Sequence, residues 1–119
     1  MQNKDKNKMN KASDVVQAQL NAYNARNIDE FVACFWDDVC VRELETGEII
    51  AQGIEPFREM YSSLFENCTA LHAKLMNRIE RGPIVIDHEH VTGMQEDTTQ
   101  EAVAIYEVDG ERIRQVWFA

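Results

Sequence analysis

A chain of 119 residues that is 45 % hydrophobic and 28 % charged has room for one hydrophobic core, so a second domain is not expected. Its formal net charge of -9 would repel phosphate backbones and anionic lipid, which excludes nucleic acid as an expected partner. No window approaches the roughly 18 apolar residues that cross a bilayer, and the first residues lack the apolar segment of a secretion signal, so we expect a cytoplasmic protein with no membrane contact.

The first residues are polar and rich in lysine, which predicts a flexible tail over residues 1–12 and a single folded domain over 13–119. Three apolar residues then recur at i, i+4 and i+7, which places them on one stripe of a helix with Ser13 or Asp14 as its N-cap. The stripe consists of Val16, Leu20 and Tyr23. Gln19 lies on the same stripe, where it either reaches solvent at the edge or faces a cavity that supplies a hydrogen-bond partner.

A second, short helix is predicted from Asn27, which is followed three residues later by Glu30 in the pattern of a capping box. Asp37 and Asp38 are expected to end it. Its predicted buried side consists of Ile28, Phe31 and Phe35.

Residues 39–44 alternate with period two and are followed by a turn at 45–48 and a short apolar run at 49–51, which predicts a β-hairpin. Gly53 ends the second strand, and Pro56 suits the first turn of a third helix. The predicted buried face of this helix consists of Phe57, Met60, Tyr61, Leu64 and Phe65.

Beyond residue 70 the sequence consists of strand-like runs separated by turn residues. The runs cover residues 71–80, 84–92, 100–108 and 112–118. The last turn contains Asp109 and Gly110, residue types that tolerate the positive φ of a tight hairpin. Helices followed by a strand meander predict an α+β domain with an antiparallel sheet and with the helices packed on one face.

Glu43 is the first candidate for chemistry. Side chains alternate along a strand, so Glu43 shares a face with Val39 and Val41 and continues an apolar surface. Partial burial would raise the pKa of this carboxyl group and make it a competent general base or acid for an apolar substrate. The alternative is a solvated carboxylate at the strand end beside Arg42.

A second concentration of polar residues is Asp87-His88-Glu89-His90, within one strand. Alternation places the two histidines on one face and the two acids on the other, and the sequence does not decide which face is inward. If the histidine face is inward, His88 is a second acid–base group near Glu43, because imidazole changes protonation near neutral pH. If it is outward, the histidines lie on the outer surface of the sheet, in a region suited to a dimer interface. A metal site is not predicted, because no third ligand is evident.

Asn77 interrupts the apolar alternation of the first long strand, much as Gln19 interrupts the first helix. The alternation places the Asn77 amide inward with Leu75 and Ile79. An inward amide can orient a ligand hydroxyl or carbonyl. The alternative is an amide that bonds neighbouring backbone or ordered water.

The three cysteines, Cys34, Cys40 and Cys68, are odd in number and have neither a CxxC spacing nor the spacing of zinc ligands. We therefore expect free or buried thiols in a reducing compartment rather than a disulfide framework.

The segments VVQAQLNAYNARNID, FWDD and AIYEVDGERIRQVWF resemble the SnoaL-like or NTF2-like superfamily, which includes ketosteroid isomerase. The resemblance extends from Asp14 onward. It implies a cone-shaped fold in which three N-terminal helices pack on a curved, mainly antiparallel sheet around a pocket. The implied partner is a small apolar molecule, and no cofactor is implied.

On the ketosteroid isomerase pattern, Glu43 stands where that family carries its proton-shuttling Asp, and Tyr61 stands where it has a supporting Tyr. The oxyanion side differs, because Gln19 occupies the position of the key Tyr and residues 102–105 occupy the region of the protonated Asp. Loss of such donors typically costs orders of magnitude in rate. A true steroid isomerase is therefore not the expected activity.

The residues and the resemblance together predict a homodimer with a pocket lined by Gln19, Glu43, Tyr61 and Asn77, and by His88 if its face is inward. If the protein is an enzyme, we expect cofactor-independent, isomerase- or cyclase-like proton transfer with Glu43 as the base. The alternative is a non-catalytic ligand-binding or dimerisation module. An epoxide-opening hydrolase would need an inward Asp–Arg–Asp relay, which the sequence does not show.

Overall fold

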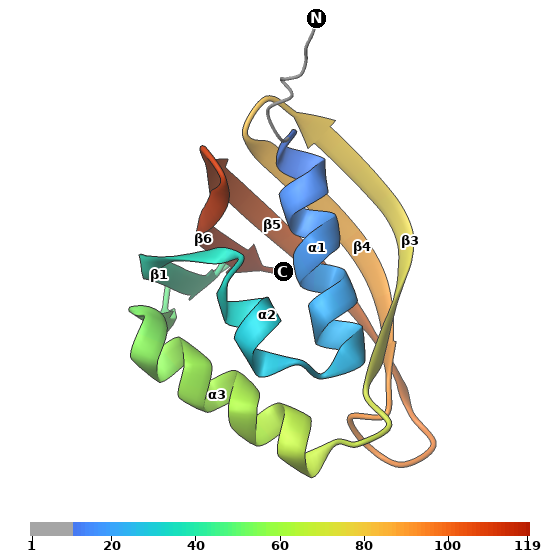
Figure 1. Cartoon of the computed structure of the whole chain (residues 1–119). Coiled ribbons are helices and arrows are strands. Elements are labelled where there is room, and N and C mark those ends of the chain that lie inside the picture. The colour runs from blue at the N-terminus through green and yellow to red at the C-terminus, as the bar shows by residue number, and fades with distance from the viewer. Residues whose placement is uncertain (1–10) are drawn as a thin grey trace, which may run out of the picture.

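The computed structural model describes residues 11–119, which form three helices and six strands (Figure 1). Residues 1–10, which make up most of the predicted tail, lie outside the described residues. The helices are α1 (Ala12–Ala25), α2 (Ile28–Val32) and α3 (Ile54–Asn67). The strands are β1 (Phe35–Glu43), β2 (Ile49–Gln52), β3 (His72–Arg81), β4 (Ile84–Thr92), β5 (Thr99–Asp109) and β6 (Arg112–Phe118). None of these helices is long and apolar enough to cross a membrane.

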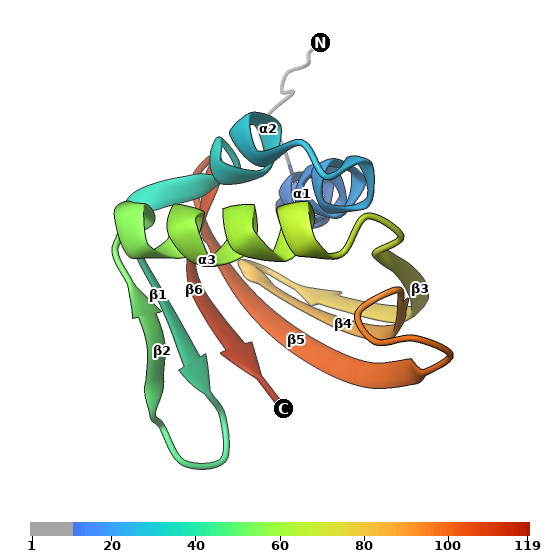
Figure 2. The ribbon, with the colours of Figure 1, turned by 90° about the horizontal axis from the view of Figure 1, so that it is seen from below.

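The strands form one sheet in the order β2-β1-β6-β5-β4-β3. Neighbouring strands are antiparallel except β1 and β6, which run parallel. The sheet curves, and the three helices lie on its concave side (Figure 2). Helix α1 packs on β3, β4 and β5, while α3 packs on β1 and β2. The predicted α+β class, with helices on one face of a mainly antiparallel sheet, is confirmed.

The strand predictions hold closely. The four runs predicted beyond residue 70 match β3 to β6 within one residue at each end. β1 and β2 form the predicted hairpin, with Val41 opposite Ala51. These elements were predictable because period-two alternation and turn residues are local signals.

Helix α1 begins at Ala12, so the predicted N-caps Ser13 and Asp14 are wrong. Lys11 is the N-cap residue, and the Asp14 carboxylate accepts a hydrogen bond from the Lys11 backbone N–H at 3.2 Å. Asp14 thus lies in the first turn of the helix, and its side chain bonds the backbone of the N-cap residue, as the N3 residue of a capping box does. The Ser13 N–H donates to the Glu80 carboxylate of β3 at 2.8 Å, a distant contact that a local pattern does not contain.

Helix α2 starts as predicted and ends earlier. The Asn27 side chain accepts a hydrogen bond from the Glu30 N–H at 3.1 Å. The helix ends at Val32, and Phe35, which was predicted to be helical, is the first residue of β1. Phe35 pairs with Ile113 of β6, so a long-range strand contact overrides the local helical pattern.

An aromatic cluster fills the space between the helices and the start of β1. It consists of Tyr23, Phe31, Phe35, Phe57, Tyr61 and Phe65. The ring centroids of Phe35 and Phe57 are 4.5 Å apart, and those of Phe31 and Tyr61 are 4.7 Å apart. Tilted aromatic pairs at such separations add to the stabilisation from buried area. The cluster therefore fixes α3 against α1 and α2.

A β-bulge in β3 reverses the predicted alternation. The register with β4 shifts between Leu75 and Asn77, so that Asn77 pairs with His88. Ile79, which was predicted to point inward, is 63 % exposed, while Arg78 turns inward. One extra residue in a strand moves the following side chains to the other face. The predicted inward position of Asn77 is therefore wrong.

Candidate functional site

A pocket of about 600 Å³ lies between the concave face of the sheet and helices α1 and α3. Much of its wall is apolar and includes Leu20, Phe31, Met60, Leu64 and Phe118. Its buried or partly buried polar side chains include Gln19, Tyr23, Tyr61, Glu89 and Tyr106. Ile50 of β2, which is 45 % exposed, also lines the pocket. A largely apolar cavity of this size with a few polar groups fits a small organic molecule.

Glu89 is the buried acidic group on the pocket wall. Its side chain lies on the concave face of β4, and the residue is 8 % exposed. Among residues 11–119 its carboxylate has no hydrogen bond or ion pair, and the buried ion pair on this strand belongs to Asp87. The pKa of Glu89 is raised to about 7, chiefly by burial and then by the Asp87 carboxylate, against the opposing effect of Arg78. A carboxyl group with this pKa exchanges a proton readily near neutral pH.

The same face of β4 carries a buried ion pair beside Glu89. Asp87 is fully buried, and its two oxygens accept hydrogen bonds from Arg78 Nε at 2.7 Å and Nη2 at 2.9 Å. The hydrogen bond with Asp87 is the main cause that raises the pKa of Arg78. Arg78 Nη1 also donates to Gln17 Oε1 of α1 at 2.9 Å. The sequence did not show this inward arginine–carboxylate pair, which occupies both oxygens of Asp87.

Three tyrosine hydroxyls share the pocket with Glu89. They belong to Tyr23, Tyr61 and Tyr106. Burial raises the pKa of all three, and the nearby Glu89 carboxylate contributes to each increase. Gln19 Nε2 donates a hydrogen bond to Tyr106 Oη at 3.2 Å. Because the tyrosine oxygen is the acceptor in this bond, the Tyr106 O–H can donate to another group. Phenols with a raised pKa stay protonated at neutral pH, so the pocket contains several neutral hydrogen-bond donors.

Two residues predicted for the pocket lie on its wall, namely Gln19 and Tyr61. Gln19 is 3 % exposed and bonds Tyr106, so the alternative in which its amide reaches solvent is wrong. Tyr61 reaches the pocket from α3 and belongs to the aromatic cluster. Their contact with a ligand stays a prediction.

Glu43 does not lie on the pocket wall. It is exposed at the end of β1, opposite Phe118, and its backbone N–H donates to the Glu48 carbonyl at 2.9 Å across the hairpin. Val39 and Val41 are fully buried as the alternation requires, but the hairpin then extends past the helices (Figure 2). The predicted desolvation of the Glu43 carboxylate is therefore wrong, because alternation gives the face of a side chain and not how far the helices cover that face.

The histidine face of β4 is the outer one. His88 and His90 lie on the surface of the sheet opposite the pocket, and His88 Nε2 is 2.6 Å from the Glu101 carboxylate of β5. The inward face carries the two buried acids instead. The prediction that His88 acts near the pocket is therefore wrong.

Comparison with known proteins points to one fold family. Residues 16–116 match the family model of the SnoaL-like domain. An uncharacterised cystatin-fold protein from Novosphingobium aromaticivorans is 25 % identical, with a TM-score of 0.83 over 92 % of this chain and 98 % of that one. The fold is shared by a proposed ketosteroid isomerase from Kribbella flavida, which is 18 % identical with a TM-score of 0.78 over 93 % of this chain and 79 % of that one. It is also shared by a proposed polyketide cyclase from Sinorhizobium meliloti, which is 15 % identical with a TM-score of 0.76 over 89 % of this chain and 94 % of that one. The comparison with curated proteins gave no significant match.

Proposed function

Because the chain belongs to the SnoaL-like domain family, we propose that its pocket binds a small, largely apolar carbonyl compound and that Glu89 moves a proton on this compound without a cofactor. The proposed reaction class is isomerase- or cyclase-like. The proposed isomerase and the proposed cyclase among the similar structures support that class at the level of the fold. The choice of Glu89 rests on the geometry of the pocket.

The observation that carries the proposal is a buried carboxylate that has no partner among the described residues 11–119. Glu89 faces an apolar cavity, whereas the neighbouring buried acid, Asp87, is paired through both oxygens. A charge that faces an apolar cavity and has no hydrogen-bond partner in the protein is unfavourable, because little water is left to solvate it. Groups held in this way are concentrated at functional sites, where their shifted pKa serves proton transfer.

In the proposed step, the Glu89 carboxylate removes a proton from the carbon next to the ligand carbonyl and returns it to another atom of the same ligand. Negative charge develops on the carbonyl oxygen meanwhile. The hydroxyls of Tyr61 and Tyr106 are neutral donors that can stabilise this oxygen, and Gln19 orients the Tyr106 hydroxyl. These tyrosines would supply the donors that the chain lacks at the positions used by ketosteroid isomerase.

We also propose that two copies of the chain pair through the outer face of the sheet. A row of apolar side chains crosses this face in register, from Ile79 through Ile86 and Ile105 to Trp117. Each of them is half-buried or exposed in the single chain. A continuous apolar row of this kind is typical of an interaction surface. Sedimentation equilibrium is expected to give the mass of a dimer, and a monomer at micromolar concentration would contradict this pairing.

The proton-transfer proposal is tested with two matched variants, Glu89→Gln and Glu43→Gln. Each removes one carboxylate at nearly constant size, one in the pocket and one on the exposed hairpin. Exchange of α-hydrogens for deuterium is followed by NMR for a panel of small ketones in D₂O. We expect the wild type to accelerate exchange, Glu89→Gln to lose at least about 100-fold, and Glu43→Gln to keep the wild-type rate.

The remaining outcomes separate the alternatives. A wild-type rate in Glu89→Gln would contradict the mechanism, and a loss confined to Glu43→Gln would return the role of base to Glu43. If no ketone exchanges but native mass spectrometry finds a retained small molecule, the non-catalytic ligand-binding module is the better description. Circular dichroism of both variants shows whether a loss of rate reflects a loss of fold.

A further inference from the structure

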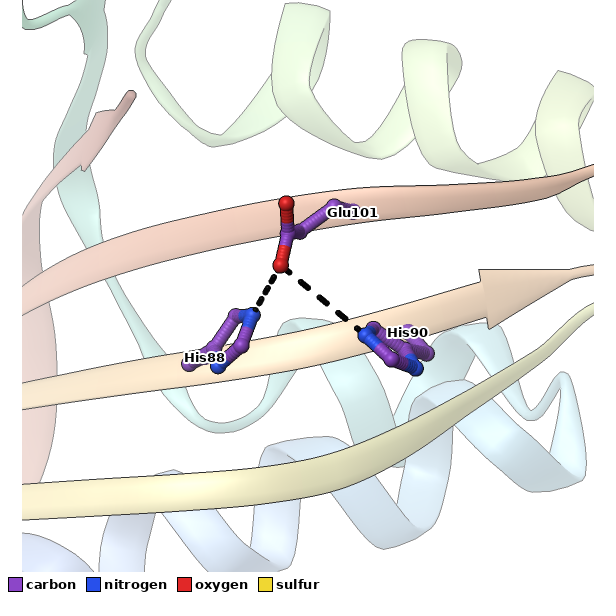
Figure 3. A group of neighbouring side chains, drawn as sticks. All are labelled: His88, His90 and Glu101. Carbon is purple, nitrogen blue, oxygen red and sulfur yellow. Dashed lines mark hydrogen bonds and ion pairs between the residues drawn. The ribbon is translucent and has the colours of Figure 1, made fainter.

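A second group of chemically active side chains lies on the outer face of the sheet (Figure 3). It consists of His88, His90 and Glu101, whose potential ligand atoms all lie within 4.8 Å of one another. Glu101 Oε2 is 2.6 Å from His88 Nε2 and 3.9 Å from His90 Nε2. The two imidazole rings stand nearly perpendicular, with their centroids 5.6 Å apart. Three donor groups from two strands therefore converge at one place.

The register of β4 and β5 produces this arrangement. His88 and His90 are two residues apart on β4, so the pleat places both on the outer face. Glu101 of β5 pairs directly with His90, and Val103 pairs with His88. The Glu101 carboxylate leans diagonally toward His88, which brings one oxygen between the two rings (Figure 3). Both strands lie inside the sheet rather than at its edge, so the backbone holds the three positions firmly.

We propose that His88, His90 and Glu101 bind a divalent transition-metal ion of the zinc type, with water at the remaining coordination positions. Imidazole nitrogen and carboxylate oxygen are ligands that zinc accepts at about 2.0–2.2 Å. Ligand atoms around a tetrahedral ion at those bond lengths are roughly 3.4 Å apart. The separations of Glu101 Oε2 from the two imidazole nitrogens, 2.6 Å and 3.9 Å, lie on either side of that value, and all separations within the group are within 4.8 Å. Small side-chain rotations are therefore enough to form the site.

A simple cross-strand ion pair explains only part of the arrangement. It accounts for His88 and Glu101, but it leaves the His90 nitrogen 3.9 Å from the same oxygen, which is beyond hydrogen-bond length. A metal ion would use all three groups. In the single chain the side chains are 32 %, 41 % and 68 % exposed in the order His88, His90 and Glu101, so an ion and its water molecules have access beside the apolar row that we propose as the dimer contact.

The charges around the site permit a cation. The chain has a formal net charge of -9, and Glu101 supplies a carboxylate to the site itself. Lys74 of β3 lies opposite His90 in the register and opposes cation binding. It is exposed, and its flexible side chain can keep the ammonium group in solvent. The substitution Lys74→Gln removes this positive charge and is therefore expected to strengthen metal binding.

The test uses protein without an affinity tag, freed of metal by a chelator that is then removed. Zn²⁺ binding is measured by titration calorimetry, and Co²⁺ binding by visible absorption, which reports the ligand geometry. We expect one Zn²⁺ per chain and at least tenfold weaker binding in His88→Ala and in Glu101→Gln. His72→Ala is the matched control, because His72 is an exposed histidine of β3 outside the group, and it should keep the wild-type affinity.

The proposal is overturned if the wild type binds Zn²⁺ no more tightly than the double variant His88→Ala/His90→Ala. Equal binding in all variants would overturn it too, because the thiols would then be the better candidates. A loss in His72→Ala as large as that in His88→Ala would likewise contradict it. Glu89→Gln is expected to leave Zn²⁺ affinity unchanged, so failure of this site and failure of the pocket mechanism are separate results. Circular dichroism confirms that each variant is folded.

Discussion

The two faces of β4 carry ionisable side chains in equal number and hold them in opposite ways. On the concave face, Asp87 and Glu89 are 0 % and 8 % exposed, one paired through both oxygens and the other facing the pocket. On the outer face, the side chains of His88 and His90 are 32 % and 41 % exposed and gather around Glu101. The pleat of one strand therefore sorts consecutive residues into two environments.

The difference shows that coverage by the helices, more than residue type, decides what a polar group on this strand can do. A buried charge is costly unless it is paired, so each acid on the concave face is either fixed in an ion pair or kept ready for proton transfer. Exposed ion pairs contribute little to stability. The outer side chains can therefore give up their contacts with one another at little cost, as the proposed metal site requires. Substitutions on the two faces should therefore differ sharply in their effect on the free energy of unfolding.

The largest effect is expected from Asp87→Ala. The substitution leaves the Arg78 guanidinium, whose side chain is 17 % exposed, without its partner. Removing one member of a buried pair typically costs about 3–5 kcal/mol. Urea unfolding at pH 7 should show a loss in this range. A loss below about 1 kcal/mol would mean that Arg78 reaches water when Asp87 is absent.

The double variant Asp87→Leu/Arg78→Met sharpens the same comparison. Replacing a buried ion pair by apolar residues of similar volume is often neutral, because both desolvation costs disappear together. We expect this variant to unfold with a free energy closer to that of the wild type than to that of Asp87→Ala. If the two variants are equally unstable, the cost comes from packing around Asp87 rather than from the unpaired guanidinium.

Glu89→Gln should change stability in a pH-dependent way. The folded-state pKa is raised from 4.5 to about 7, so the folded protein holds this proton over a pH range in which the unfolded chain has lost it. The wild type therefore loses stability as pH rises from about 4.5 through 7. The Gln variant lacks this loss, so it should gain roughly 2–3 kcal/mol relative to wild type between pH 4 and pH 8.

The measurement for Glu89→Gln is urea unfolding across this pH range, with a chelator present so that the outer face carries no metal. Glu43→Gln is the control for the loss of one negative charge from a highly acidic chain. A difference between Glu89→Gln and wild type that stays constant with pH would show that the Glu89 carboxyl group is solvated. It would also weaken the case for Glu89 as the base.

Much of the fold was predictable because its signals are local. The apolar stripes of α1 and α3 and the alternation of the later strands are each contained within one element. The errors arose where distant segments decide the outcome. Phe35 leaves the helical pattern because β6 pairs with it, and Asn77 points outward because a bulge interrupts β3.

The candidate site was only partly predictable. Segment 87–90 was visible as a polar interruption of a strand, but hydrophobicity did not decide which face was inward. The acid face is shared by Val85 and Val91, and the histidine face by Ile84 and Ile86. Arg78 was the signal that could have decided, because it pairs with Asp87, yet the bulge places it out of the expected alternation. Tyr106 carried no signal beyond that of a core aromatic residue.

Substitutions of the two amides predicted for the pocket, Gln19 and Asn77, are expected to have smaller effects on the free energy of unfolding. Gln19 is 3 % exposed and donates to Tyr106, whereas Asn77 is exposed on the outer face. Gln19→Leu should lower the free energy of unfolding by about 1 kcal/mol through the lost hydrogen bond. Asn77→Ala should stay within about 0.5 kcal/mol of wild type. Equal effects in thermal unfolding would contradict the assignment of the two residues to different faces.

The smallest effects on stability are expected from His88→Ala and His90→Ala, measured in the presence of a chelator. The contact between His88 and Glu101 is exposed, and exposed pairs contribute about 0–1 kcal/mol. Each variant should therefore unfold within about 0.5 kcal/mol of wild type, in contrast to Asp87→Ala on the opposite face of the same strand. A loss of several kcal/mol in either histidine variant would mean that the proposed contact between two copies extends from the row of Ile79, Ile86, Ile105 and Trp117 to the histidines. In that case the histidines would belong to the interface between copies, and the comparison of the two faces would have to be made for the dimer.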